Sequence, residues 1–259
     1  VESPATDFIL PEPKRLEGGV EKNLHSVMDD TIGMGKQMLV FVSSRSSAQK
    51  EARELSSHLK TRLENGDLGF AESVVESWTS MSQELWRGED GSATVKALSN
   101  SVRGGVGFHH AGLTSSQRKV IENGFRNGNL QCIVATPTLA QGVNLPASRV
   151  VVRDTRRWST IASRSMPLPV MEVRQMMGRA GRPGFDDFGE SFLVSKNIQD
   201  ESNLVELYLR GESEQVTSKL ANPSAQRAEQ DGALLAHILS IVATAGINDR
   251  DGICLLYTS

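Results

Sequence analysis

Cysteine is almost absent from this chain of 259 residues. Only Cys132 and Cys254 occur, so neither a disulfide framework nor a zinc site with cysteine spacing is available. Long apolar runs are missing as well. The longest one, Leu234–Ile247, contains His237 and falls short of the roughly 20 residues that a membrane span needs. No basic-then-apolar signal peptide opens the chain. These absences favour an intracellular protein without a membrane segment.

A general excess of positive charge is also lacking, because the formal net charge is -3. This balance excludes a uniformly basic coat for nucleic acid, although it allows a local basic track. Such a track runs from Arg149 to Arg182, where eight arginines and no lysine occur and the only acids are Asp154 and Glu172. The remaining composition, 38% hydrophobic and 23% charged, is sufficient for a substantial core.

Short apolar strands alternate with helical patterns through most of the chain. Gln37–Ser43 is typical of a buried strand, and apolar residues at helical spacing follow it over 48–63. Thr114 and Gln117 fit a capping box that opens a later helix. Further strands are predicted at 106–108, 130–135, 148–154 and 190–194. The alternation predicts an α/β fold with a parallel sheet and helices on both faces, in which ligands gather at the carboxyl ends of the strands.

The domain boundaries are predicted from changes in this pattern. Residues 66–105 are less regular and indicate a helical insertion, and after about residue 213 the periodicity becomes that of separate helices. We expect a linker over 1–20, the α/β domain over 21–213, the start of a small helical domain over 214–252, and a truncated or non-native tail over 253–259. Because the first residue is valine, we interpret the N-terminus as a cut edge.

The segment Gln175–Gly184 reads Gln-Met-Met-Gly-Arg-Ala-Gly-Arg-Pro-Gly. Read as a helix that its proline ends, it places Gln175, Arg179 and Arg182 on one stripe. Each of its first two glycines would cost about 1 kcal/mol in that helix relative to alanine. Arginine forks bind phosphate oxygens bidentately, and glycine allows a ligand to approach the backbone closely. The pattern therefore indicates a phosphate site; the alternative is a surface helix whose arginines pair with nearby acids.

Four segments together resemble a known family. Val40–Arg45, Phe108–Leu113, Ala135–Asn144 and Gln175–Gly184 are similar, in order and spacing, to motifs IV, IVa, V and VI of superfamily-two helicases. Their spellings resemble the Ski-like branch, and the segment around Arg153–Trp158 resembles the archaeal DNA helicases related to the polymerase-theta helicase. The resemblance spans about residues 8 to 246. It implies a RecA-like domain followed by the start of a winged-helix domain.

A phosphate-cradling P-loop, Gly-x-x-x-x-Gly-Lys-Ser/Thr, does not occur in the sequence, since Gly35–Lys36 is followed by Gln37. No Asp-Glu pair follows a buried strand to hold magnesium. The chain thus resembles the second motor domain alone. The resemblance implies that ATP with Mg²⁺ binds between this domain and a missing first motor domain, which holds the metal. No metal ligand is expected in this chain.

The resemblance also implies which residues touch the nucleotide. Arg179 and Arg182 are the candidates to contact the γ-phosphate, and Arg182 is the expected arginine finger. Gln175 would lie beside the phosphate, where it polarises or senses it. Gly142 and Asn144 match the part of motif V that touches the nucleotide. For Asn144 the alternative is a turn amide that closes its own loop.

The nucleic-acid contacts are implied at the ends of three strands. Small side chains and backbone N–H groups there suit phosphate oxygens and carry little base information. The residues that match are Ser44, Arg45, His110, Ala111, Gly112 and Thr136. For His109 and His110, a core or turn histidine is the competing interpretation.

The pattern over residues 149–172 predicts a protruding β-hairpin with a polar turn at Ser159–Ser163. In the resembled DNA helicases, a hairpin at this position parts the duplex. Trp158 would then stack on the terminal base pair, a contact worth about 1–3 kcal/mol. The arginines expected to hold phosphates are Arg156, Arg157 and Arg164. The alternative is an ordinary hairpin with Trp158 in the core.

Together, the residues and the resemblance predict the second RecA-like domain of an ATP-dependent helicase. The resemblance implies a monomer that moves 3′ to 5′ on single-stranded or forked DNA in repair or replication restart. An RNA helicase of the same branch is one alternative, because phosphate and stacking contacts do not identify the sugar. A non-catalytic nucleic-acid-binding module is another, although it would have no need for Gln175, Arg179 and Arg182. Autonomous ATP hydrolysis by this chain is not expected.

Overall fold

The computed structural model describes residues 23–87, 91–160, 162–182, 184 and 186–211. The expected linker over 1–20, the helical domain over 214–252 and the tail over 253–259 lie outside the described residues. None of the helices in the described part is long and apolar enough to cross a membrane.

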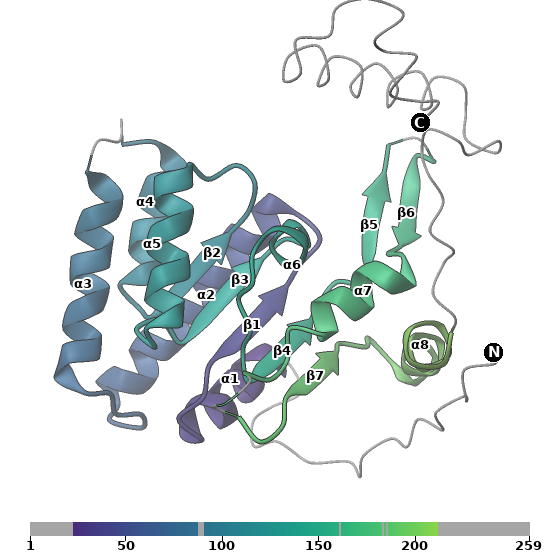
Figure 1. The fold of residues 1–259 in the computed structure, drawn as a ribbon, viewed down its shortest axis with the longest axis horizontal. Coiled ribbons are helices and arrows are strands. Elements are labelled where there is room, and N and C mark those ends of the chain that lie inside the picture. The colour runs from purple at the N-terminus through teal and green to yellow at the C-terminus, as the bar shows by residue number, and fades with distance from the viewer. Residues whose placement is uncertain (1–22, 88–90, 161, 183, 185, 212–259) are drawn as a thin grey trace, which may run out of the picture. The chain divides into compact units, whose positions relative to one another are not determined.

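A parallel sheet of five strands forms the centre of the fold (Figure 1). Its strand order is β2-β3-β1-β4-β7. The strands are β1 (Met38–Phe41), β2 (Val106–His109), β3 (Cys132–Ala135), β4 (Arg149–Val152) and β7 (Glu190–Leu193). The first four are buried along their whole length, whereas β7 at one edge is partly exposed. The predicted α/β fold with a parallel sheet is confirmed, and each predicted strand overlaps an observed one.

Helices flank this sheet (Figure 1). They are α1 (Asn23–Gly33), α2 (Arg45–Glu64), α3 (Glu72–Trp86), α4 (Ala93–Val102), α5 (Ser115–Arg126), α6 (Thr138–Gly142), α7 (Val170–Met177), α8 (Ile198–Leu204) and a π-helical segment η2 (Val205–Arg210). Local sequence fixes two of the starts. The Ser44 side chain caps α2 by accepting a hydrogen bond from the Ser47 amide. The predicted capping box of Thr114 and Gln117 opens α5.

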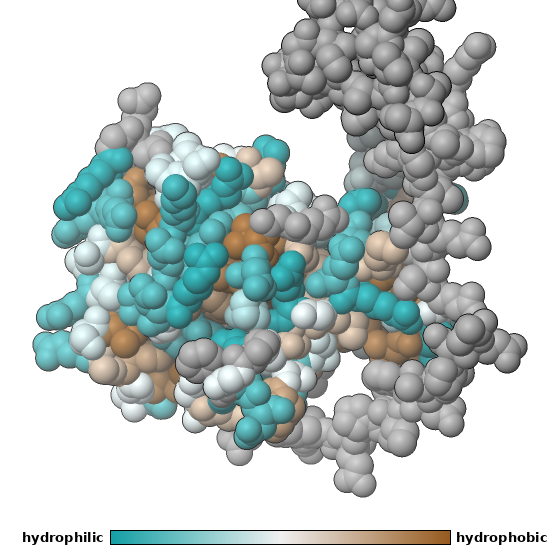
Figure 2. Space-filling view, viewed as in Figure 1, coloured by the Kyte–Doolittle hydropathy of each residue, from teal (hydrophilic) through white to brown (hydrophobic). Residues whose placement is uncertain are grey.

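Helices α3 and α4 occupy the region where the sequence is least regular. They pack against each other, and α3 also packs against α5. Helix α3 buries one apolar face, which includes Trp78, Met81 and Leu85. The Trp78 indole N–H donates to the Asn129 carbonyl at 2.6 Å. The face shown in Figure 2 is mostly hydrophilic, with apolar side chains in small separate patches.

A two-stranded antiparallel hairpin extends away from the sheet (Figure 1). It consists of β5 (Arg156–Ser159) and β6 (Arg164–Pro167), with Trp158 opposite Ser165. The predicted hairpin is therefore confirmed. Trp158 is 66% exposed, so the alternative that places this side chain in the core is wrong.

The prediction of a continuous helix through Gln175–Gly184 is wrong. Helix α7 ends with Gly178 as its C-cap, and Gly181 adopts a φ of +89°, which favours glycine. The chain after the helix instead pairs with the segment before β4. Ala180 forms a parallel bridge with Ala147, and the Gly181 amide donates to the Ala147 carbonyl at 2.8 Å. The two arginines of the motif consequently lie beyond the helix and share no helical stripe with Gln175.

Candidate nucleic-acid and nucleotide sites

The first candidate site is a pocket at the carboxyl ends of β1, β2 and β3. The parallel register aligns the last residues of these strands, Phe41, His109 and Ala135. The loops that follow therefore meet at one edge of the sheet. The pocket is lined by Ser43, Ser44, Arg45, Ala111, Thr136, Pro137, Thr138, Arg157, Leu168 and Glu172. Five predicted nucleic-acid contacts lie in this lining: Ser44, Arg45, Ala111, Thr136 and Arg157.

The electrostatics of this pocket favour an anion. It includes the N-terminus of the 20-residue helix α2, whose dipole places partial positive charge there. Arg45 and Arg157 add two guanidinium groups. Arg157 Nη1 donates to Glu172 Oε1 at 2.9 Å, so part of its charge is compensated within the domain. Hydroxyls of serine and threonine supply further hydrogen-bond partners for phosphate oxygens.

Asp154 organises this edge and was not among the predicted site residues. Its Oδ2 accepts hydrogen bonds from the Ser43 amide at 2.9 Å and from the Ser43 hydroxyl at 3.1 Å. The carboxylate thus fixes the loop between β1 and α2 from the end of β4. The sequence signal was its position, because Asp154 is one of only two acids within the arginine-rich track.

The two histidines at the end of β2 are internal. His110 is 2% exposed, and its Nδ1 accepts from the Gly112 amide at 3.1 Å. His109 Nε2 lies 3.0 Å from Glu122 Oε1. Burial lowers the pKa of both imidazoles below the usual value, so both are neutral at pH 7. The structure supports the interpretation as core and turn histidines, and the His110 side chain is not presented to a ligand.

Gly112 nevertheless lies beside Arg45, a predicted nucleic-acid contact. A Cβ at this position would be 3.2 Å from Arg45 Nη1, so glycine leaves room for the guanidinium group. The turn that His110 stabilises therefore borders the same pocket.

The second candidate site lies at the C-terminal end of α7. A pocket there is lined by Ala140, Gln175, Gly178 and Arg179. Arg179 Nη1 donates to Asn144 Oδ1 at 3.1 Å, and its Nη2 donates to the Ala140 carbonyl. Gly142 ends α6, two residues before Asn144. The structure therefore brings Gln175, Arg179 and Asn144 together, and the Asn144 side chain bonds to a distant arginine instead of closing its own turn.

Arg182 lies elsewhere and does not line this pocket. Its Nε and Nη2 donate to the two carboxylate oxygens of Asp186 at 2.9 and 3.2 Å, and its Nη1 donates to Gln37 Oε1 at 2.9 Å. Gln37 precedes β1, so this cluster lies at the amino edge of the sheet, opposite the first pocket. In this structure Arg182 is thus paired with an acid, as the alternative interpretation of the motif expected for its arginines.

Asp186 holds this cluster together and was also missed. Its side chain is 2% exposed and accepts from Lys36 Nζ at 2.6 Å and from the Ser148 hydroxyl. The Arg182 guanidinium holds the pKa of this carboxyl well below its usual range. The spacing of four residues between Arg182 and Asp186 was no helical ion-pair signal, because both residues lie beyond the end of α7.

The hairpin carries the remaining predicted contacts. Arg156 Nη2 donates to the Ser165 carbonyl across the hairpin at 2.8 Å. Trp158 and Arg164 are exposed. Among the described residues, no group of three or more His, Cys, Asp or Glu side chains could hold a metal ion.

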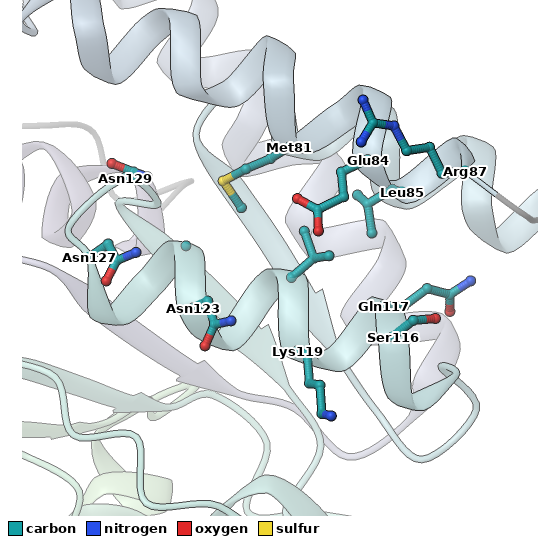
Figure 3. A pocket seen from close by; sticks show the side chains of 12 residues that line it. Met81, Glu84, Leu85, Arg87, Ser116, Gln117, Lys119, Asn123, Asn127 and Asn129 are labelled. Atoms are coloured by element: carbon teal, nitrogen blue, oxygen red, sulfur yellow. The ribbon is translucent and has the colours of Figure 1, made fainter.

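A further groove lies between α3 and α5 (Figure 3). Met81 and Leu85 contribute apolar surface, while Glu84, Arg87 and Lys119 add charges. None of the predicted site residues lines it. It is therefore separate from both candidate sites.

The five-stranded parallel sheet with its flanking helices is the architecture of a RecA-like α/β domain. Residues 88–184 match the family described as the helicase conserved C-terminal domain. The chain is therefore similar, over this range, to the C-terminal domain of superfamily-two helicases.

Several curated proteins are similar to this chain. One from Methanocella arvoryzae, described as ATP-dependent DNA helicase Hel308, is 37% identical over 233 residues, which are 90% of this chain and 29% of that protein. Proteins of the same description from Pyrococcus horikoshii and Caldivirga maquilingensis are 36% and 38% identical over 88% and 92% of this chain. The chain spans about three-tenths of the length of these relatives.

Proposed function

We propose that this chain is the C-terminal motor half of an ATP-dependent DNA helicase. The proposed enzyme moves 3′ to 5′ on single-stranded DNA and unwinds forked duplexes in repair or replication restart. The observation that supports the proposal is that one domain carries two separate pockets, each lined by predicted site residues. One contains Ser44, Arg45 and Thr136 at the carboxyl edge, and the other contains Gln175 and Arg179 at the end of α7.

The nucleotide would be shared with a first motor domain in the same full-length chain. That domain would supply the P-loop and the acids that hold Mg²⁺, while this chain contributes cationic groups across the cleft. Arg179 already lies beside Gln175. Arg182 can serve as arginine finger only after exchanging its Asp186 carboxylate for a phosphate. The relatives' description as ATP-dependent DNA helicases supports the choice of ATP and DNA. We also propose an intracellular monomer.

The test is the ATPase rate of the full-length protein with single-stranded DNA. Loss of an arginine finger slows nucleotide hydrolysis by roughly 10³- to 10⁵-fold, so Arg182→Ala should fall in this range, with Arg179→Ala as the second candidate. Arg126→Ala is a matched control, because this exposed arginine on α5 lines neither pocket and should leave turnover unchanged.

Three outcomes contradict parts of the proposal. Undiminished turnover in Arg182→Ala removes the finger assignment from that residue. Stimulation by single-stranded RNA but not DNA favours an RNA helicase of the same branch. A full-length protein without nucleic-acid-stimulated ATPase is not a motor, and would support a binding module.

A further inference from the structure

The phenol of Tyr208 lies at the root of the hairpin. Tyr208 belongs to η2 and is 1% exposed. Its hydroxyl lies 3.1 Å from the Thr155 carbonyl and 3.0 Å from the Leu168 carbonyl, so one O–H is shared between two acceptors. Thr155 precedes β5 and Leu168 follows β6, and the Leu168 amide donates to the Thr155 carbonyl at 2.8 Å. A single side chain therefore bridges both strands where they enter the hairpin.

Arg174 fixes the segment that carries this tyrosine. It lies on α7, directly before Gln175, which lines the second candidate site. Its Nε donates to the Tyr208 carbonyl at 3.1 Å, and its Nη2 donates to the Leu209 and Gly211 carbonyls at 3.3 and 2.5 Å. These are carbonyls at the end of a helical segment, where partial negative charge favours a cation. The guanidinium group thereby ties the end of η2 to α7.

A third contact joins the hairpin to the same helix. The Glu172 side chain on α7 is 11% exposed and accepts from Arg157 on β5. Two-stranded hairpins are marginally stable on their own, so this one depends on what holds its base. Here the base is held by α7 directly through Glu172, and indirectly through Arg174 and Tyr208.

We propose that Tyr208 and Arg174 are positioning residues for strand separation. They make the hairpin β5–β6 a rigid extension of α7, the helix that also carries Gln175 in the pocket at its C-terminal end. When α7 moves on nucleotide binding, the hairpin then moves with it, because the base of the hairpin is fixed to this helix. This inference rests on the proposed function, because it concerns the step in which the hairpin parts the duplex.

The test compares unwinding with ATP hydrolysis in the full-length protein. Tyr208→Phe removes the single O–H that the two carbonyls share and keeps the ring in the core. We expect DNA-stimulated ATPase within about twofold of wild type and roughly 5-fold fewer base pairs unwound per ATP, the scale of one lost net hydrogen bond. Hydrogen exchange at the amides of 156–167 should be faster. Ser202→Ala is the matched control, since it removes an exposed hydroxyl from α8 next to the same segment.

Each result decides the proposal. Unchanged base pairs unwound per ATP in Tyr208→Phe overturns it. An equal loss of ATPase and unwinding also overturns it, because the tyrosine would then support the fold in general. Arg174→Gln should reproduce the Tyr208→Phe pattern. If the wild-type protein shows no stimulated ATPase, the proposed function fails, while faster hydrogen exchange in the Tyr208→Phe hairpin would still support the anchoring contact separately.

Discussion

At the scale of single residues, Asp186 shows how a buried carboxylate determines the position of a neighbouring arginine, Arg182. Its carboxylate receives the Arg182 guanidinium, the Lys36 ammonium and the Ser148 hydroxyl in one nearly inaccessible position. Asp186→Asn keeps the shape but removes the charge. Because hydrogen bonds to charged groups contribute about 1.5–3 kcal/mol, we expect the free energy of unfolding to fall by about 2 kcal/mol in urea titrations at pH 7. Asp187→Asn, at the exposed neighbouring acid, should change it little.

The same contact predicts how this difference depends on pH. The folded-state pKa of Asp186 is depressed below its ordinary value of 3.8. A depressed carboxyl pKa contributes stability above the unfolded-state value, and this contribution is lost as the pH falls toward the folded-state value. The stability difference between wild type and Asp186→Asn should be constant from pH 7 to about pH 5 and shrink below about pH 4. A difference that stays constant down to pH 3 would mean that the carboxylate charge is not its source.

At the scale of elements, strands and helix starts could be predicted from the sequence where a few neighbouring residues determine them. The predicted strands and the capping box at Thr114 are of this kind, and the structure contains them. The end of α7 has its causes elsewhere. Ala180 pairs with Ala147, and a Cβ at Gly189 would lie 2.2 Å from the Gly181 amide nitrogen, so the loop is shaped by distant backbone. These contacts could not be predicted from local residue spacing, which indicated a continuous helix.

The candidate sites also differ in how far the sequence predicts them. Strand ends are aligned by the register of a parallel sheet, so the meeting of Ser44, Ala111 and Thr136 follows from the strand predictions themselves. The contact of Arg182 with Gln37 does not, because these residues lie 145 positions apart in the sequence. The sequence motif indicated two phosphate-binding arginines. Only the tertiary contacts distinguish Arg179, in the pocket, from Arg182, in an internal ion pair.

The exposed aromatic side chain on the hairpin contributes little to folding. Trp158 is 66% exposed, so its removal should cost little stability, whereas base stacking is worth about 1–3 kcal/mol. We expect Trp158→Ala in the full-length protein to slow forked-duplex unwinding by roughly 5- to 100-fold, and more than it slows ATP hydrolysis. Trp158→Phe keeps an aromatic face and should recover most of the rate. Equal unwinding by Trp158→Ala and wild type in a strand-displacement assay would exclude a stacking role.

At the scale of the whole molecule, positive charge is placed locally on a chain whose net charge is -3. Binding to single strands should therefore come from a few guanidinium groups around the carboxyl-edge pocket, because the negative net charge of the chain disfavours non-specific contact. For single strands, each phosphate contact contributes about -0.7 to the slope of log affinity against log salt. If Arg45 contacts one phosphate, Arg45→Ala in the full-length protein should make this slope shallower by about 0.7, equally for different oligonucleotide sequences.

Fluorescence anisotropy with labelled single strands over a range of salt concentrations measures this slope directly. Arg126→Ala removes an equal charge from α5, outside the pocket, and should leave the slope unchanged. Comparing the two variants separates a local contact from a change in net charge, because both raise the negative charge of the molecule by one unit. Identical slopes for Arg45→Ala and Arg126→Ala would show that the carboxyl-edge pocket is not where the strand is held. A slope change only for Arg45→Ala would place a backbone phosphate at the N-terminus of α2, where the helix dipole, the Ser44 hydroxyl and the Thr136 hydroxyl converge.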